Sequence, residues 1–520
     1  MCAFSPDHTD FKSLFNKKRN QLLTSFYDLP FHRLVRGGEI TWTSDEDFVN
    51  EAVLKAYKRA VYTQKGYYEN PWETQYLPHV SNRIKETDLY KFLERMPKGA
   101  ILHLHPSSMG EYGDLLNTAA EQTWNGKTYW VDLDEEKIIF QESSPGGAYV
   151  SLREALADPD KSHRIVSWFR ITGEELHQDT DTGPWVYFRD KFNKVGMLLD
   201  YNNPELCYHY YYNAFRHLLT IDNIMHVELR TSWKVENEKH EGSKESVILK
   251  ALAAVNRDCG GNSGLTLKII WSDSRTFARK ERKTILEDII YVGHQVKSPD
   301  NVYLIGYDLV SEGRGGETFY YLLDDISSAY SQLGGFLPPF FWHDGESELP
   351  PDYEPHHQNG NKFPRNVYFS NNLIDAYLMS NPPFQNRVGR VGHGIELFKT
   401  PKLLEEYCEL ELPVELCPVS SQFLKYIKNL REHPGQSYLA SGLPVSLSPD
   451  DPAIYSYQGV TIDFWEACMA WNLDLKMLKT LSYYSLKCSG LSSVEKKETI
   501  VTWRHLWDDF IKRQIAETIP

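Results

Sequence analysis

The feature that most constrains the fold of this chain is a series of eight short apolar segments that begins near residue 96 and alternates with helical stretches. Near-continuous apolar runs of this length are typical of parallel strands that are covered on both faces. The segments cover residues 99–105, 224–230, 265–273, 301–310, 336–346, 390–394, 412–418 and 443–451. Eight such strands, with helices between most of them, predict an α/β fold, a (β/α)8 (TIM) barrel. An open doubly wound sheet is the alternative.

Two regions lie outside this simple alternation. Residues 1–95 carry apolar side chains at three- and four-residue spacing, which predicts an N-terminal helical extension that either wraps the main body or forms an oligomer contact. The barrel is expected to occupy residues 96–520. More than a hundred residues separate its first two strands, so residues 106–220 are expected to contain an insertion on the first β→α connection. Residues 127–141 within it have the pattern of a β-hairpin.

Composition and charge exclude several classes of partner. The net charge of −15 argues against broad binding of nucleic acid or of anionic membrane surfaces. No apolar run approaches the ~18 residues that a membrane span needs. The N-terminus lacks the basic region and apolar stretch of a signal peptide. Seven scattered cysteines without a CxxC pair do not indicate a disulfide framework. These observations together predict a cytoplasmic protein.

Polar side chains follow several of the predicted strands at the point where each strand ends. His103 and His105 lie on the same side of the first strand, because side chains alternate along a strand. The fifth, sixth and eighth strands end in His343 with Glu346, in His393, and in Asp450 with Asp451. Each feature alone is also explained by an ordinary polar strand end or a turn. Because the carboxyl ends of barrel strands converge on one face, we expect these side chains to lie together.

The kinds of ligand atom in this set indicate a metal-dependent hydrolytic site. Imidazole nitrogen and carboxylate oxygen, without thiolate, suit zinc in a catalytic rather than a structural site. Three histidines and one aspartate leave a position for water, and zinc lowers the pKa of bound water to about 7. Glu346 lies three residues after His343, where its carboxylate can transfer protons. The sequence therefore predicts one Zn²⁺ ion per chain.

Seven motifs carry a resemblance to a known family. They are MPKGAILHLH, HVELR, GYDLV, FWHDGE, RVGHG, PVELCPVSSQFL and SLSPDDPA, and together they span about residues 90–520. In this order they resemble the adenosine deaminase superfamily, most closely its branch of adenosine deaminase 2 and related growth factors. The resemblance implies a zinc-dependent hydrolytic deaminase that converts the 6-amino group of adenosine or deoxyadenosine to a 6-oxo group and releases ammonia.

The resemblance also assigns roles to matching positions. It implies four zinc ligands, which are His103, His105, His343 and Asp450. It implies that Glu346 protonates the purine ring nitrogen next to the attacked carbon. His393 would orient the attacking hydroxide and stabilise the developing oxyanion, where electrostatic stabilisation is strongest. Asp450 would also accept a proton from the water, and Asp451 would bond to the imidazole part of the purine.

The sequence departs from the family pattern at the end of the site that would hold the sugar. Where the family has an aspartate soon after H-x-H, this chain has Pro106, followed by two serines, and proline offers neither a side-chain acceptor nor a backbone donor. The family glycine that lies against the purine corresponds to Ser311, where a backbone N–H contact remains available. Asp344 stands in place of the usual alanine. These changes leave the metal residues intact and put the recognition of the sugar in question.

A basic stretch after the third predicted strand leads to an alternative substrate. Arg275 lies nearest the strand end, and arginine matches phosphate oxygens with two hydrogen bonds. The more ordinary explanation, and the one that the pattern favours, is a solvated start of a helix. If Arg275 contacts a phosphate, the substrate is a 5′-phosphorylated adenine nucleotide such as AMP or ATP.

Two further alternatives stay open. One is a catalytically inactive, growth-factor-like binding protein, although the complete ligand set and Glu346 argue against it. The other is a different amidohydrolase reaction, such as hydrolysis of a cyclic amide. For the favoured function the expected partners are a small-molecule purine nucleoside or nucleotide and a second copy of the chain in a homodimer. No nucleic acid or membrane is expected.

Overall fold

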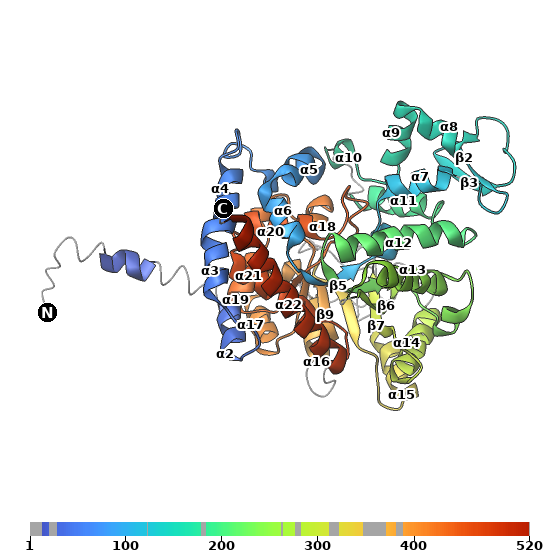
Figure 1. Ribbon diagram of the computed structural model, residues 1–520. Coiled ribbons are helices and arrows are strands. Elements are labelled where there is room, and N and C mark those ends of the chain that lie inside the picture. Colours follow the sequence, from blue (N-terminus) through green and yellow to red (C-terminus); the bar gives the residue numbers. More distant parts are fainter. Residues whose placement is uncertain are drawn as a thin grey trace, which may run out of the picture.

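The structure is a computed structural model, and the part of the chain that it describes is residues 13–19, 29–121, 123–177, 184–261, 264–275, 282–310, 322–346, 371–380 and 388–518. Its architecture is a barrel of parallel strands surrounded by helices, with helical and mixed additions on two sides (Figure 1). Among the described residues, no helix combines the length and the apolar character needed to cross a membrane.

Eight parallel strands form the barrel, in the order β1-β5-β6-β7-β8-β9-β10-β11. Their bounds are Gly99–Leu104, Ile224–Arg230, Thr266–Ser274, Leu304–Val310, Phe340–Asp344, Val388–His393, Val414–Leu416 and Val445–Leu447. A parallel bridge between Leu104 and Asp450 joins the first strand to the residues that follow the last. The (β/α)8 barrel predicted from the eight apolar segments is therefore confirmed, and each observed strand overlaps its predicted segment.

Helices cover the outside of the barrel, and their apolar faces are buried against the strands. From β5 onward they are α13 (Lys244–Cys259), α14 (Arg282–Lys297), α15 (Leu323–Gln332), α16 (Asn371–Ser380), α17 (Pro401–Glu409), α18 (Pro418–Phe423), α19 (Gly435–Ser441), α20 (Thr461–Ala470), α21 (Leu475–Lys487) and α22 (Ser493–Thr518). Several of these helices have an N-cap residue. The Ser243 side chain accepts a hydrogen bond from the backbone of α13, and the Asp474 side chain accepts one from the backbone of α21. Short 3₁₀ segments occupy Val235–Lys239, Ile395–Lys399 and Leu430–Glu432.

The N-terminal part of the chain is helical and packs on the last two helices (Figure 1). Its elements are α2 (Leu29–Arg36), α3 (Ser44–Phe48), the π-helical η1 (Val49–Leu54), α4 (Lys55–Tyr62), the 3₁₀ turn η2 (Trp72–Thr74), α5 (Leu77–Glu86) and α6 (Asp88–Arg95). The buried Glu46 carboxylate accepts hydrogen bonds from the indole N–H of Trp507, at 2.8 Å, and from Lys479. This part is therefore fixed to the barrel, and an oligomer contact through it stays a prediction.

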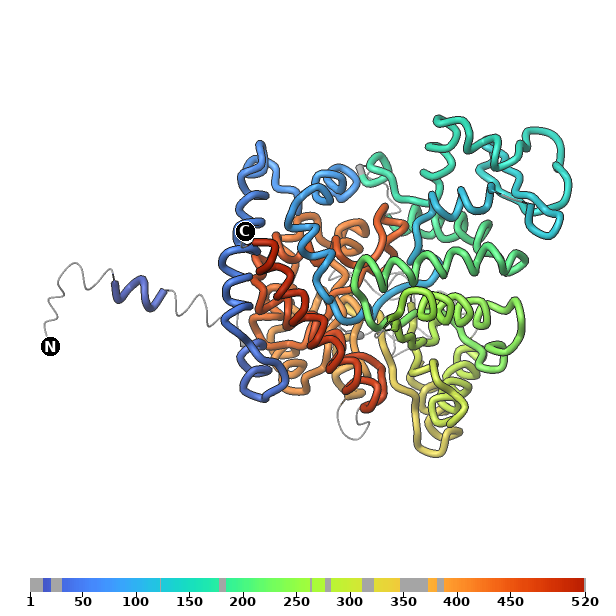
Figure 2. Tube along the Cα trace, in the orientation of Figure 1, coloured from blue at the N-terminus to red at the C-terminus, as the bar shows by residue number. Residues whose placement is uncertain are grey.

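The connection between β1 and β5 holds a small substructure of its own. It contains η3 (Pro106–Ser108), α7 (Tyr112–Glu121), β2 (Thr128–Asp132), β3 (Lys137–Gln141), β4 (Val150–Ser151), α8 (Leu152–Ala157), α9 (Pro159–Ser167), α10 (Gly173–His177), α11 (Trp185–Val195) and α12 (Pro204–Thr220). The predicted hairpin is formed by β2 and β3, which pair antiparallel from Thr128 opposite Gln141. Figure 2 shows the hairpin end of this region far from the N-terminal helices α2, α3 and α4, whereas α10 lies beside α5.

Candidate active site

The polar residues predicted to meet at the carboxyl ends of the strands do so in the structure. His103 lies on β1 and His105 directly follows it, His343 lies on β8, His393 ends β9, and Asp450 follows β11. The backbone of His393 has a φ of 64° and that of Asp450 a φ of 63°, a conformation that residues with a side chain rarely adopt. Such strained positions cluster at functional sites, because the surrounding structure must hold them there.

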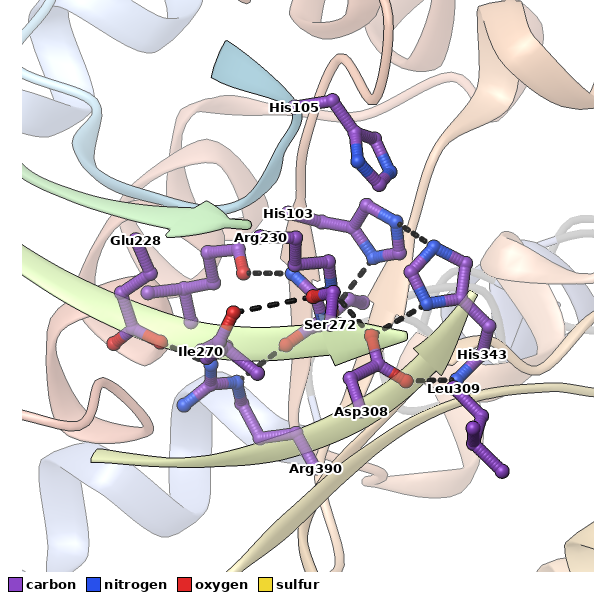
Figure 3. Close-up of polar contacts among 12 residues, drawn as sticks. His103, His105, Glu228, Arg230, Ile270, Ser272, Asp308, Leu309, His343 and Arg390 are labelled. Atoms are coloured by element: carbon purple, nitrogen blue, oxygen red, sulfur yellow. Dashed lines mark hydrogen bonds and ion pairs between the residues drawn. The ribbon is translucent and has the colours of Figure 1, made fainter. Parts of the chain in front are cut away.

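The imidazole rings of His103 and His343 face each other, and the Nε2 atom of each ring, which could bind a metal, points toward the other ring. Their Nε2 atoms lie 2.9 Å apart. On the far side of each ring, Nδ1 contacts a buried carboxylate: Glu415 at 2.8 Å from His103, and Asp308 at 2.6 Å from His343 (Figure 3). A carboxylate that accepts the Nδ1 proton leaves the Nε2 lone pair available, which is the usual arrangement behind metal-bound histidines. Both rings are therefore oriented to hold a cation between them.

Asp450 brings the remaining predicted ligands to this point. Its Oδ1 atom lies 3.4 Å from Nε2 of His103 and 3.3 Å from Nε2 of His105, while the Ser420 hydroxyl donates to Oδ2 at 2.7 Å. The ligand atoms of His103, His343, His393 and Asp450 all lie within 4.8 Å of one another, and His105 groups with Asp450 and Asp451. The donor set of the site thus fits a metal ion, and it places His393 beside the predicted ligands.

The electrostatic environment of His343, His393 and Asp450 favours the protonation states that metal ligands need. At His105, burial opposes protonation, but Asp451 and Asp450 outweigh it and raise the pKa. Burial lowers the pKa of His343 to about 3, and burial together with the nearby His103 holds the pKa of His393 well below its ordinary value. Burial alone would raise the pKa of Asp450, but hydrogen bonds from His103 and His105 outweigh it and hold this pKa well below its usual range. Neutral imidazoles and an ionised carboxylate are the forms that bind metal ions.

A buried network of arginines and carboxylates lies beneath the two facing histidines (Figure 3). Arg230 donates to Asp308 at 2.8 Å and to Glu415 at 2.6 Å, so one guanidinium holds the carboxylates behind both rings. Arg390 donates to Glu415 at 2.5 Å and also to Glu228. Burial opposes ionisation of Glu415, but the two arginines hold its pKa well below its usual range. Sequence reasoning missed these residues, although a charged residue inside an otherwise apolar strand was the signal available.

Glu346 and His393 face each other beside the metal ligands. Oε1 of Glu346 lies 3.7 Å from Nε2 of His393, and both side chains are buried. Among the residues that the structure describes, neither ring nitrogen of His393 has a hydrogen-bond partner, so this buried imidazole is available to a bound molecule. The glycine before His393 is needed for space: a Cβ atom at Gly392 would lie 2.8 Å from Cε1 of His103.

Pro106 has a structural role at the point where the chain departs from the family pattern. It opens the 3₁₀ turn η3, a position where a missing backbone N–H is tolerated. The turn brings the Ser108 hydroxyl onto Oδ1 of Asp451, and the Ser108 carbonyl accepts the N–H of Ala453 at 2.9 Å. Burial and the charge of Asp450 raise the pKa of Asp451 well above its ordinary value. Ser108 therefore fixes the carboxyl group for which purine binding was expected.

Arg275 and Ser311 were also predicted to contact the substrate. Arg275 is only 2% exposed, and its guanidinium donates to the carboxylate of Asp344 at 2.9 Å and to the backbone carbonyl of His343. Because the guanidinium makes these contacts within the protein, it does not point toward a bound phosphate. The predicted contact between Arg275 and a 5′-phosphate is therefore wrong. The physical reason is the buried negative charge of Asp344, which requires a counter-ion. Ser311 lies outside the described residues.

The fold and the site define a class of protein. A parallel (β/α)8 barrel with a histidine and carboxylate cluster at the carboxyl ends of its strands has the arrangement of a metal-dependent enzyme. Comparison with known proteins narrows this class. A family model described as "Adenosine deaminase" matches residues 384–502. These matches support the adenosine deaminase superfamily, in the branch of adenosine deaminase 2, as the family of this chain, and an aminohydrolase as its kind of enzyme.

Individual relatives resemble the chain over most of its length. Adenosine deaminase 2 of Dictyostelium discoideum is 25% identical over 82% of this chain and 75% of its own. Adenosine deaminase 2 of Pongo abelii is 29% identical over 82% of this chain and 81% of its own. A solved amidohydrolase from Burkhoderia ambifaria, with bound Zn, superposes with a TM-score of 0.52 at 15% identity and covers 82% of this chain and 95% of its own. This last likeness supports the fold.

Proposed function

We propose that the protein is a zinc-dependent hydrolytic deaminase that converts the 6-amino group of adenosine or deoxyadenosine to a 6-oxo group and releases ammonia. The observation that carries the proposal is the pair of facing Nε2 atoms of His103 and His343, 2.9 Å apart, each backed by a carboxylate. His105 and Asp450 complete the proposed ligand set. Imidazole and carboxylate donors without thiolate suit zinc in a catalytic rather than a structural site.

The other residues of the site are assigned the roles that the family resemblance implies, and their positions support these roles. A bound zinc ion supplies Lewis acidity and lowers the pKa of a water molecule to about 7. Glu346 carries a proton to the purine ring nitrogen beside the attacked carbon, and Asp450 accepts a proton from the attacking water. His393 orients that water through a ring nitrogen that has no hydrogen-bond partner among the described residues. Asp451, held by Ser108, bonds to the imidazole part of the purine.

The same geometry favours a nucleoside over a nucleotide. Arg275, the residue expected to bind a 5′-phosphate, is buried against Asp344 and the backbone of His343. The donor that motivated AMP or ATP as the substrate is therefore engaged within the protein. Deamination of a phosphorylated adenine nucleotide is the second candidate and is decided by experiment.

An ammonia-release screen tests the proposal. The zinc-loaded protein is incubated with adenosine, deoxyadenosine, AMP, ATP and N6-substituted analogues, and ammonia is measured together with the 6-oxo product. Turnover of adenosine or deoxyadenosine in preference to AMP and ATP is expected. A clear preference for AMP or ATP would replace the nucleoside with a nucleotide, and no ammonia from any compound would favour an inactive binding protein.

The homodimer and the cytoplasmic location stay predictions. Light scattering of the purified protein checks the first, with a mass of twice the 60.3 kDa chain as the expected result. Cell fractionation checks the second.

A further inference from the structure

Arg275 connects the carboxyl ends of three neighbouring barrel strands. It directly follows β6, and its backbone N–H donates to the carbonyl of Val310 at the end of β7, at 2.9 Å. Its side-chain Nε donates to the Leu309 carbonyl at 3.1 Å. A terminal nitrogen of the same guanidinium donates to the backbone carbonyl of His343 and to Oδ1 of Asp344, both on β8. One side chain therefore fixes β8 relative to β6 and β7 behind the metal ligands.

Arg275 and Asp344 depend on each other because both are buried. Each is 2% exposed. Removal of one partner from a buried ion pair leaves an uncompensated charge, which is strongly destabilising, whereas replacement of both by apolar residues is often tolerated. Asp344 stands where the family pattern has alanine, so the acidic residue and its arginine are expected to be retained or lost together.

The segment 343–346 carries both a proposed metal ligand and the proposed proton donor. On the β9 side, the N–H of Gly394 donates to the carbonyl of Asp344 at 2.9 Å, and the N–H of Glu396 donates to the carbonyl of Gly345 at 3.0 Å. Gly345 itself has a φ of 66°, which turns the chain so that Glu346 can face His393. Arg275 supplies the hold on the opposite side, toward β6 and β7.

We propose that Arg275 and Asp344 form one positioning pair that sets the places of the His343 imidazole and the Glu346 carboxyl group. This inference rests on the proposed function for the roles of His343 and Glu346. The Arg275 guanidinium contacts the His343 carbonyl and the Asp344 carboxylate, so the pair acts on His343 and Glu346 through the backbone of β8. Its loss should weaken metal binding and slow the chemical step, and should leave substrate affinity nearly unchanged.

A double-mutant cycle on the full chain tests the pair without reference to activity. Arg275→Met, Asp344→Ala and the double variant are compared with the unmodified protein for zinc affinity, measured by competition with a chelator. We expect Arg275→Met to lose about 10–100-fold in affinity, as for other residues that orient metal ligands. The double variant should recover about tenfold of this loss, because contacting charges are coupled. Arg275→Lys keeps the charge without the planar guanidinium, so its zinc affinity should lie between those of the unmodified protein and of Arg275→Met.

Kinetics and a control pair separate positioning from general destabilisation. With saturating zinc, Arg275→Met should lower kcat for adenosine and change KM by less than about twofold, because an interaction away from the substrate adds no binding energy. The control is Lys479→Met combined with Glu46→Ala, a buried pair between α3 and α21. It should lower the melting temperature, because Glu46→Ala also removes the acceptor of the Trp507 N–H and the capping box of α3, without a change in zinc affinity or kcat.

The outcomes distinguish this inference from the proposed function. If the double variant loses as much zinc affinity as the product of the two single losses, Arg275 and Asp344 act independently and the pair is refuted. If the control pair shifts zinc affinity equally, the effect is general destabilisation and the inference also fails. If the unmodified protein binds zinc and shows the coupling, yet releases no ammonia from any adenine compound, the positioning pair stands and the deaminase proposal does not.

Discussion

Replacement of Arg230 by methionine tests the claim that one buried arginine orients both facing histidines. The guanidinium donates to Asp308 at 2.8 Å, to Glu415 at 2.6 Å and to the Leu102 carbonyl at 2.6 Å. Methionine fills much of the same volume but offers no donor and no charge. Asp308 and Glu415 would then be buried with one cation fewer, and the Nδ1 contacts of His103 and His343 would lose their fixed partners.

The size of the effect follows from these contacts. Two hydrogen bonds to charged groups contribute about 1.5–3 kcal/mol each, or about 3–6 kcal/mol together. The loss of one partner from a buried ion pair costs about 3–5 kcal/mol. The two estimates overlap at about 3–5 kcal/mol, which is the unfolding free energy that the Arg230→Met variant is expected to lose. Because the carboxylates hold the metal-facing histidines, zinc affinity should fall by about 10–100-fold.

Two measurements check this prediction: thermal unfolding in the presence of a chelator, and zinc affinity by chelator competition. Arg431→Met is the matched control, since Arg431 also pairs with a buried carboxylate, Glu73 at 2.7 Å, outside the network of Arg230. The control should lower the melting temperature and leave zinc affinity unchanged. Zinc affinity of Arg230→Met equal to that of the unmodified protein would refute the role of Arg230.

Three further changes have defined outcomes. Glu346→Gln should keep its zinc and lose about 10²–10⁴-fold in kcat, because its proton transfer is removed; substantial residual turnover in an ammonia assay would contradict the assigned role. His103→Ala should purify with little zinc, and one zinc per chain by elemental analysis would make the ligand assignment wrong. Burial lowers the pKa of His433 to about 3, so between about pH 3 and its ordinary value of 6.5 only the unfolded chain binds a proton, and stability rises with pH across this window. His433→Asn should flatten this rise by up to about 1.4 kcal/mol per pH unit in chemical unfolding, and an unchanged slope would refute it.

The strands and the ligand residues could be predicted from the sequence because each has a local signature. The apolar runs predict strands, and His103, His343, His393 and Asp450 lie at the ends of those strands or shortly after them. The barrel rule then brings strand ends together without any knowledge of side-chain contacts. The residues proposed to bind the metal could therefore be predicted from the sequence alone.

The buried residues behind the proposed metal ligands could not be predicted, because their contacts depend on which distant side chains meet. Asp308 and Glu415 lie inside apolar strands, where nothing in the sequence tells which histidine each will contact. Arg275 lies in a basic stretch that favoured a phosphate contact, and only the structure places it against Asp344, 69 residues further along the chain. Burial and pairing of charges are properties of the folded chain rather than of a local pattern.

The seam of the barrel gives the site a consequence for folding. His103 and His105 stand at the first strand and Asp450 follows the last, and the bridge between Leu104 and Asp450 is the contact that closes the ring. Contacts between such distant segments form late, because a long loop must be closed before they contribute. A growing or truncated chain that ends before residue 450 lacks Asp450. It therefore cannot bring the ligands at the first strand and after the last strand together around a metal. Uptake of the proposed metal would therefore report that the barrel has closed, and the bound ion would stabilise the contact between the first and last strands.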